Sequence, residues 1–370
     1  MNGFHYCRVI WAERIGHTRV ARGPQGEEIA MRNVLAAGLL MLAASIAANA
    51  QHYKVTDNIP IPGEGGWDYL YADSANRTLY VAHNTVVDMV NLDTQKPLGK
   101  ISGMQHVHGI AVAEDLNRGF ISDGGSGEVV VFNLKTHAVL QKVKAGTNPD
   151  GILYDPASRR VFAFNGGSKD ATAIDAASGK VAGTIALGGK PEFPATDAKG
   201  DVYVNIEDKS ELVRLDPRTL KIKQRWSIAP CEEPSGLAFD VAARRLFPVC
   251  DNKMMAVVNA ETGKVEATVP IGEGPDAAGY DSARKLVFSS NGHDGTLTVV
   301  KQESPDKYSV AQTVTTEKSA RTMALDAKTH KLYLAAAKLG PIPPPSKENP
   351  HPRFPSVVPG TFHLVVVSPQ

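Results

Sequence analysis

The chain has 370 residues, of which 42% are hydrophobic, enough to bury a sizeable core. Its 40 basic and 39 acidic residues give a formal net charge of +1, so it lacks the basic surplus of a typical nucleic-acid-binding protein. Single-stranded nucleic acid is disfavoured as a partner for a second reason, since only 6% of the residues are aromatic and could stack on bases.

The first fifty residues are predicted to lie outside the folded domain. Residues 31–50 have the pattern of a signal peptide: Arg32, an apolar run of about 14 residues over 34–47, and a small-residue cleavage site at Ala48-Asn49-Ala50. The run is shorter than the roughly 20 residues of a membrane span, although a retained anchor is the alternative. Residues 1–30 are then a non-native upstream extension, and the mature chain, 51–370, has no membrane span and is periplasmic or secreted.

An internal repeat runs through the rest of the chain. Each unit has an acidic residue after its first apolar strand, and an apolar pair begins six residues later, or five in the fourth unit. The acidic residues are Asp73, Glu114, Asp155, Asp197, Asp240, Asp281 and Asp326, at spacings of 41, 41, 42, 43, 41 and 45. A period of about 40–45 residues with four short strands per unit is typical of β-propeller blades.

The predicted fold class is therefore all-β: a single seven-bladed β-propeller of four-stranded blades over residues 51–370. The seventh unit ends with its third strand, Thr361–Val367, and the segment 53–61 before the first unit resembles a fourth strand. We predict that this N-terminal strand joins the last blade and closes the ring, which removes two exposed sheet edges.

Two segments carry a family resemblance. Leu79–Asn84 and Val202–Asn205 resemble the tyrosine–valine–threonine–asparagine repeat, and Asn148–Ile152 resembles the turn that opens each blade in that family. The mature chain is thus similar to YncE-like, YVTN-repeat propellers. The resemblance implies a binding scaffold, whose partner here is an unknown small molecule or a periplasmic protein, and a monomer is expected.

The start of each first strand is the predicted site, because these strands line the central channel of a propeller and ligands bind where loops from rigid blades converge. Five positions before each acidic residue, or six in the second unit, the chain places Asp68, His108, Asp150, Glu192, Ser235, Asp276 and Arg321. Carboxylates with one imidazole suit a divalent cation, the one cofactor considered, held by Asp68, His108, Asp150, Glu192 and Asp276. The alternative is that these carboxylates cap turns and that Arg321 neutralises a neighbour.

Histidines near the same face are the candidates for acid–base catalysis, because imidazole titrates near neutral pH. They are His106, His108 and His293, while His83 and Arg321 are added to the ligand-binding candidates. The chain contains no nucleophile elbow, zinc-protease helix, phosphate loop or haem-attachment motif.

Two further features fall on this face. Cys231 and Cys250 are predicted to form a disulfide at one end of blade five, with two metal-binding thiols as the alternative. The proline-rich insertion 340–360 is interpreted as a lid or a docking arm with Phe354 as its anchor, or else as a variable surface loop.

Two functions follow from these features. The favoured one is an exported scaffold that binds a ligand or a protein through its top-face funnel. The alternative is a metal-dependent enzyme, a lactonase-like hydrolase or a lyase with an axial cation, and the missing catalytic motifs make an enzyme the second choice.

Overall fold

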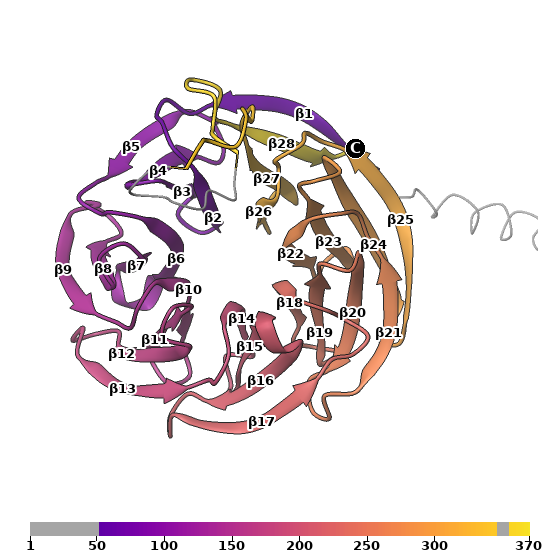
Figure 1. Cartoon of the computed structure of the whole chain (residues 1–370), viewed down its shortest axis with the longest axis horizontal. Helices are drawn as coiled ribbons and strands as arrows, with labels where there is room; N and C mark the ends of the chain where they lie inside the picture. Colours follow the sequence, from indigo (N-terminus) through magenta and orange to yellow (C-terminus); the bar gives the residue numbers. More distant parts are fainter. Residues whose placement is uncertain (1–51, 346–354) are drawn as a thin grey trace, which may run out of the picture. The chain divides into compact units, whose positions relative to one another are not determined.

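The computed structural model describes residues 52–345 and 355–370, which form seven four-stranded antiparallel sheets arranged as blades in a ring (Figure 1). The predicted signal peptide, the upstream extension and Phe354 lie outside the described residues. Among those residues, no helix is both long enough and apolar enough to cross a membrane.

The first four blades follow the chain in order. Blade one contains β2 (Trp67–Asp73), β3 (Thr78–His83), β4 (Val86–Asn91) and β5 (Pro97–Ile101). Blade two contains β6 (Val107–Ala113), β7 (Arg118–Asp123), β8 (Glu128–Asn133) and β9 (Val139–Lys144). Blade three contains β10 (Pro149–Asp155), β11 (Arg160–Asn165), β12 (Asp170–Asp175) and β13 (Val181–Ala186). Blade four contains β14 (Pro191–Thr196), β15 (Val202–Ile206), β16 (Glu211–Asp216) and β17 (Lys221–Ser227).

The last three blades complete the ring. Blade five contains β18 (Pro234–Asp240), β19 (Arg245–Cys250), β20 (Met254–Asn259) and β21 (Val265–Pro270). Blade six contains β22 (Pro275–Asp281), β23 (Leu286–Asn291), β24 (Thr296–Ser304) and β25 (Lys307–Thr315). Blade seven contains β26 (Thr322–Asp326), β27 (Lys331–Ala336), β28 (His363–Pro369) and β1 (Tyr53–Pro60). Two 3₁₀ turns, η1 (Glu114–Leu116) and η2 (Glu207–Lys209), lie between strands.

The repeated acidic residue ends or follows the innermost strand of each blade, and in six blades its carboxylate accepts hydrogen bonds from the turn that comes next. Oδ1 of Asp73 accepts the backbone N–H of Asn76 at 2.9 Å, and Oδ1 of Asp240 accepts that of Ala243 at 3.0 Å. Both carboxylates are buried. Such an Asx-type turn satisfies backbone donors that a strand ladder would otherwise leave unpaired, which is why the repeat is visible in the sequence.

The core is divided among the contacts between neighbouring blades. Seven hydrophobic clusters each combine side chains from two adjacent sheets, for example Phe120 and Val161 between blades two and three. Each blade therefore depends on both of its neighbours, as expected for a radial repeat.

The ring closes as predicted, because β1 is the outermost strand of the last blade. It pairs antiparallel with β28, from Tyr53 opposite Pro369 to Pro60 opposite His363, with one bulge after Val55. Beyond this ladder, the backbone N–H of Gln370 donates to the carbonyl of His52 at 2.8 Å. The third strand of this blade begins at His363, two residues later than the sequence pattern indicated.

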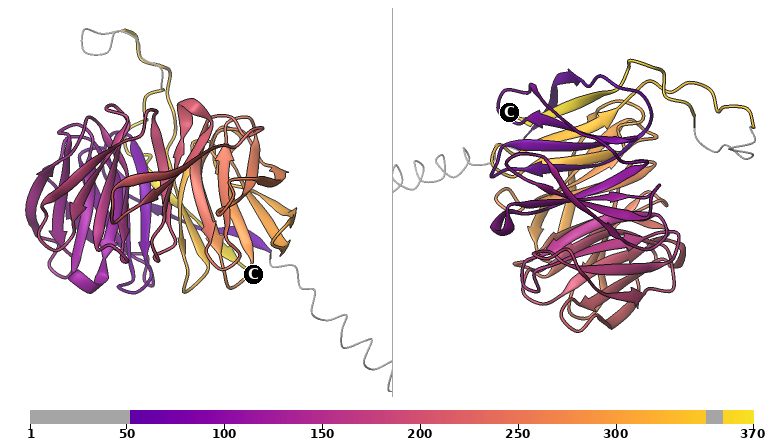
Figure 2. Two further views of the ribbon diagram at one scale, coloured as in Figure 1. Left: turned by 90° about the horizontal axis from the view of Figure 1, so that it is seen from below. Right: turned by 90° about the vertical axis from the view of Figure 1, so that its left-hand side faces the viewer.

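The proline-rich insertion connects β27 to β28. Its described parts form an arm that projects away from the blades (Figure 2). At the base of the arm Leu339 pairs with Val357 in a single antiparallel bridge, and Leu339 and Ile342 are largely exposed.

Candidate functional site

The axial residues lie at equivalent places in the blades. In six blades the residue is the second of the innermost strand, and in blade seven Arg321 directly precedes β26. The pairing register of each of these six strands shifts across that residue, which marks a β-bulge. A bulge re-aims a side chain out of the regular alternation, so the backbone of these six blades turns one side chain toward the axis.

Three axial side chains from blades one to three come together. Nδ1 of His108 lies 2.6 Å from Oδ2 of Asp68 and 3.6 Å from Oδ1 of Asp150. The three residues can each offer one ligand atom so that all three atoms lie within 4.8 Å of one another. Burial opposes the charge on His108, but the hydrogen bond to Asp68 and the charge of Asp150 outweigh it and raise the pKa of the imidazole to about 9.

The buried position of Asp150 has the opposite consequence for its own charge. Burial, followed by repulsion from Asp68, raises the pKa of Asp150 to about 7, although His108 and Lys190 act against this shift. Burial and the charge of Asp150 also hold the pKa of Glu192 well above its usual range.

Glu192 and Asp276, the other predicted metal ligands, each have a cationic partner. Nζ of Lys190 lies 2.6 Å from Oε1 of Glu192 and also pairs with Glu207. Arg321 pairs with Asp276 and donates through Nη2 to the carbonyl of Trp67 at 2.9 Å. The structure therefore separates the five predicted ligands into one compact trio and two ion pairs, and Arg321 neutralises a neighbour as the alternative interpretation expected.

The remaining histidine candidates lie apart from the trio or at its edge. His83 is 2% exposed, packs on Phe362 with ring centroids 4.2 Å apart, and places Nδ1 2.8 Å from Asp88. His293 is exposed in the turn between β23 and β24. His106 is also exposed, and its ring centroid lies 4.6 Å from that of His108. Burial and the charge of His108 lower the pKa of His106.

Two aromatic residues beside the axial site, Tyr69 and Phe193, were not predicted from the sequence. Tyr69 follows the axial Asp68, is 9% exposed, and has a hydroxyl with no hydrogen-bond partner among the described residues. Its ring lies 4.2 Å, centroid to centroid, from that of Phe193, which follows the axial Glu192. Nε2 of His108 is also buried, and the side chain of Asn148 beside this ring favours its charged form. The only sequence signal for the two aromatic residues is their place directly after an axial residue.

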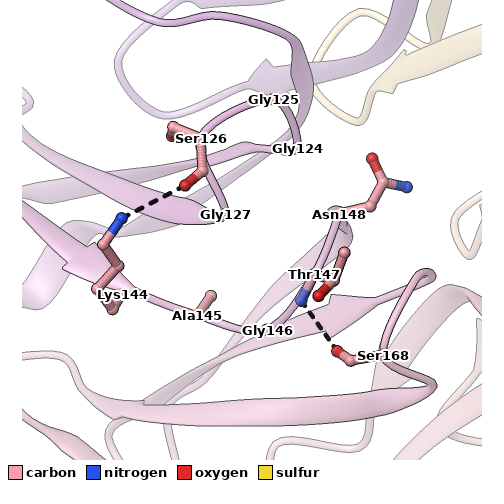
Figure 3. A pocket seen from close by; sticks show the side chains of 10 residues that line it. All are labelled: Gly124, Gly125, Ser126, Gly127, Lys144, Ala145, Gly146, Thr147, Asn148 and Ser168. Atoms are coloured by element: carbon pink, nitrogen blue, oxygen red, sulfur yellow. Dashed lines mark hydrogen bonds between the residues drawn. The ribbon is translucent and has the colours of Figure 1, made fainter.

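A polar groove of about 430 Å³ lies between the loops of blades two and three (Figure 3). Its lining comes from Gly124–Gly127, from 144–148 and from Ser168. A Cβ added at Gly124 would lie 2.6 Å from both Oδ1 of Asn148 and Nε2 of His108, so the groove ends beside the axial trio. No carboxylate from the described part of the chain lines this groove, which gives it a different chemistry from the axis.

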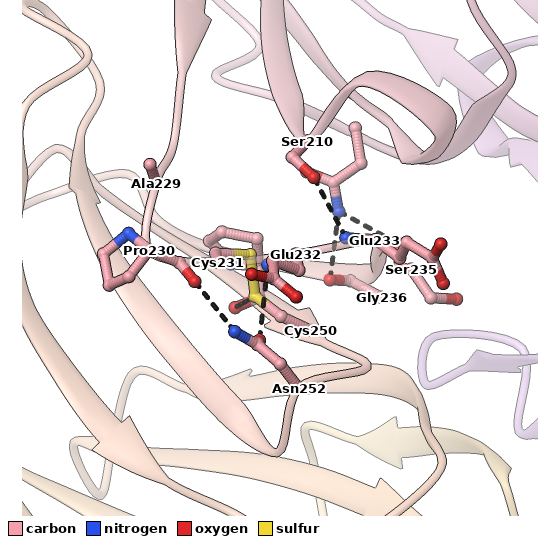
Figure 4. Close-up of a disulfide and its surroundings, with 12 residues drawn as sticks. Ser210, Ala229, Pro230, Cys231, Glu232, Glu233, Ser235, Gly236, Cys250 and Asn252 are labelled. Atoms are coloured by element: carbon pink, nitrogen blue, oxygen red, sulfur yellow. Dashed lines mark hydrogen bonds between the residues drawn. A yellow bond between two sulfur atoms is a disulfide. The ribbon is translucent and has the colours of Figure 1, made fainter.

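Cys231 and Cys250 form the predicted disulfide at the start of blade five (Figure 4). Both residues are buried, and their Cα atoms are 5.5 Å apart across a sequence separation of 19. The bridge holds the loop that enters β18, which carries the axial Ser235.

Replacing both cysteines with serine is expected to lower the free energy of unfolding by about 3 kcal/mol, because the bridge restricts the unfolded chain over a loop of this length. Guanidinium unfolding of the oxidised wild type and of the double variant measures the difference. Equal midpoints and slopes for the two proteins would contradict the expectation.

Comparisons with known proteins agree on the fold alone. No protein-family model and no curated protein matches the sequence. Among solved structures, a chain of a mitotic checkpoint complex has a TM-score of 0.71 at 12% identity and covers 98% of each chain. The hydrazine synthase of Kuenenia stuttgartiensis has a TM-score of 0.64 at 15% identity, covering 74% of this chain and 94% of its own. The WD40 repeats of RRP9 have a TM-score of 0.70 at 8% identity, covering 87% and 98%. These structural similarities establish the β-propeller fold. An activity has to be inferred from the residues of the site.

Proposed function

We propose that this chain is an exported binding protein of the YncE-like kind, and that its ligand site is the axial mouth formed by the starts of the innermost strands. The observation that supports it best is the buried trio of Asp68, His108 and Asp150, beside which the buried hydroxyl of Tyr69 has no hydrogen-bond partner among the described residues. Buried polar atoms without partners cost free energy, so their presence at the meeting point of rigid blades favours a site that a ligand completes.

Export is part of the same proposal. The signal-peptide pattern of residues 31–50 and the disulfide both favour an oxidising compartment, the periplasm or the exterior. Intact mass of the protein recovered after expression with residues 31–50 in place tests it. A mature chain that starts at Gln51 is the expected result, and a chain that retains the segment would contradict export by cleavage.

A metal-dependent hydrolase or lyase is the second candidate, favoured by the compactness of the trio. Asp68, Asp150 and Nδ1 of His108 would hold a divalent cation, which would supply polarisation of a carbonyl group. In that case His106, exposed beside His108, is the residue placed to move a proton. Glu192 and Asp276 are less suited to the metal because Lys190 and Arg321 already neutralise them.

Calorimetric titration with MnCl₂, together with elemental mass spectrometry of the purified protein, separates these two functions. If the enzyme candidate is right, the wild type binds one equivalent, and Asp150→Asn weakens binding by about tenfold or more through loss of one charged ligand. Asp57→Asn, an equivalent change on the exposed outer strand β1, serves as the control. Absence of metal and of Mn²⁺ binding in a folded wild type would exclude the metal enzyme and leave the axial mouth as a site for an organic ligand.

A further inference from the structure

A cavity of about 250 Å³ continues from the axial mouth along the innermost strands of blades one to four. Each of these strands contributes an axial residue and then, one or two positions later, a residue that lines the cavity. The first lining residues are Tyr69 after Asp68, Gly109 after His108, Ile152 after Asp150 and Phe193 after Glu192. The cavity therefore begins where the ring of charged side chains ends.

The side chains that line this cavity are mainly apolar and aromatic. Tyr71 and Tyr154 add two half-buried rings to Tyr69 and Phe193, and Ile110, Ile152 and Leu153 supply aliphatic surface. None of the described Asp, Glu, Lys or Arg residues lines it. At this volume, below the roughly 300–1,000 Å³ of pockets that hold drug-sized ligands, the cavity suits a molecule with about one ring or a short alkyl body.

The charges at the mouth do not balance. Arg321 pairs with Asp276, Lys190 with Glu192, and His108 lies closest to Asp68. Among the described residues Asp150 has no cation of its own, because the one nearest to it, His108 at 3.6 Å, is already paired more closely with Asp68. Within the described chain no hydrogen bond to its carboxylate is found, although its side chain is only 12% exposed. A buried carboxylate in this state attracts a cation.

Tyr69 connects this carboxylate to the cavity. Its ring lines the cavity, while its buried hydroxyl lies among the axial carboxylates and has no hydrogen-bond partner among the described residues. A Cβ added at Gly151, next to Asp150, would lie 3.5 Å from that hydroxyl. Aromatic faces beside a carboxylate are the combination that binds organic cations, through cation–π attraction together with charge pairing.

We propose that the natural ligand is a small amphipathic organic cation. Its ammonium group pairs with Asp150 beside the Tyr69 hydroxyl, and its apolar body occupies the cavity between Tyr69, Phe193 and Ile152. This proposal rests on the axial mouth being the ligand site. A metal ion bound by the trio would also neutralise Asp150, but it would not occupy the aromatic cavity. An organic cation accounts for both features and is therefore favoured.

Calorimetry with four probes tests the ligand class: benzyltrimethylammonium, benzylamine, the neutral benzyl alcohol and MnCl₂. The two aromatic cations are expected to bind at least about thirtyfold more tightly than benzyl alcohol, the size of effect seen when one partner of a buried charge pair is lost. Asp150→Asn removes most of this preference, whereas Asp57→Asn, on the exposed outer strand, retains it.

Phe193→Leu removes an aromatic wall of the cavity but keeps the position apolar. It therefore still tests the proposal if the Asp150→Asn variant does not fold. It is expected to weaken binding of the two aromatic cations several-fold and to leave any Mn²⁺ affinity unchanged. Circular dichroism and thermal unfolding confirm that each variant is folded.

The outcomes separate the ligand class from the site. If Mn²⁺ binds and Asp150→Asn abolishes it, while neither aromatic cation binds, the organic-cation proposal is overturned and the axial site stands. Equal binding of benzyl alcohol and the cations would also overturn it, since charge would then play no part. If no probe binds to the folded wild type, both this proposal and the axial site are rejected.

Discussion

Tyr53→Ala is expected to lower the free energy of unfolding by about 3–5 kcal/mol, the range for truncating a buried aromatic side chain. Tyr53 is the first residue of β1 and is completely buried. Its ring packs edge-on against Phe288 of blade six, with centroids 5.1 Å apart, and its backbone N–H and carbonyl both bond to the side chain of Gln312 on β25. The ring of Tyr53 and the backbone bonds to Gln312 together hold the closing strand of blade seven against blade six.

Two control variants, Lys54→Ala and Tyr53→Phe, show whether the loss of stability comes from the packing of the Tyr53 ring. Lys54→Ala removes an exposed side chain from the same strand and is expected to change stability little. Tyr53→Phe keeps the ring and removes a buried hydroxyl that has no hydrogen-bond partner in the described structure, so it is expected to be neutral or stabilising. Urea unfolding measures all three variants. If Tyr53→Ala were as stable as Lys54→Ala, packing at this position would not hold the ring closed.

The second large effect is expected at the seam between blades seven and one. Asp326→Ala should destabilise the fold by about 3–5 kcal/mol, because it removes the buried partner of a largely buried arginine. Arg77 of blade one makes two hydrogen bonds of 2.9 Å to the carboxylate of Asp326, and Ser74 of the same blade donates a third at 2.7 Å. Asp326 is completely buried, whereas the side chain of Arg77 is 11% exposed.

Arg77 also provides the control for this prediction. It pairs with Asp93 at 2.9 Å, but that carboxylate is 55% exposed, so Asp93→Ala should change stability little. The hydrogen bond from Arg77 and those from Ser74 and Thr329 outweigh the effect of burial and hold the pKa of Asp326 well below its usual range.

The pH dependence of Asp326→Ala follows from this depressed pKa. The stabilisation by Asp326 is fully present above the unfolded pKa of roughly 3.9 and is lost only as the pH falls through the lower, folded-state value. Guanidinium unfolding at several pH values should show a difference between wild type and Asp326→Ala that stays constant from neutral pH to about pH 5 and shrinks only in stronger acid. A difference that already disappeared between pH 7 and 5 would contradict this assignment.

The fold was readable from the sequence because each blade repeats one physical requirement. A buried Asp caps the same turn in six blades and the exposed Glu114 takes its place in the other, so the spacing of the acidic residues indicated the blade count. The same spacing also predicted where the axial residues lie along the central channel, because equivalent positions in equivalent blades lie at the same height around the axis. Strand boundaries were less exact, as the two-residue offset at His363 shows.

The details of the site were less accessible, since they depend on which side chains meet across blade boundaries. Arg321 of blade seven reaches Asp276 of blade six in a way that no spacing encodes. Lys190 lies only two residues before Glu192, but the sequence does not show that the two side chains pair. His83 looked like a site residue because it ends a strand on the expected face, but Phe362 from the last blade covers it. Tyr69 was missed because an aromatic residue in an inner strand resembles any other core residue until the bulge beside it is known.

The pairing of β1 with β28 bears on how the protein can be attached to a surface. A fourth strand runs toward the face that bears the axial mouth, so β1 begins, and β28 ends, on the opposite face. His52 and Gln370 meet there through one backbone hydrogen bond. A tether, tag or immobilising linker joined at either of these two residues therefore departs from the rear of the ring. A sensor chip coated with the protein through one such linker would leave the axial entrance facing the solution.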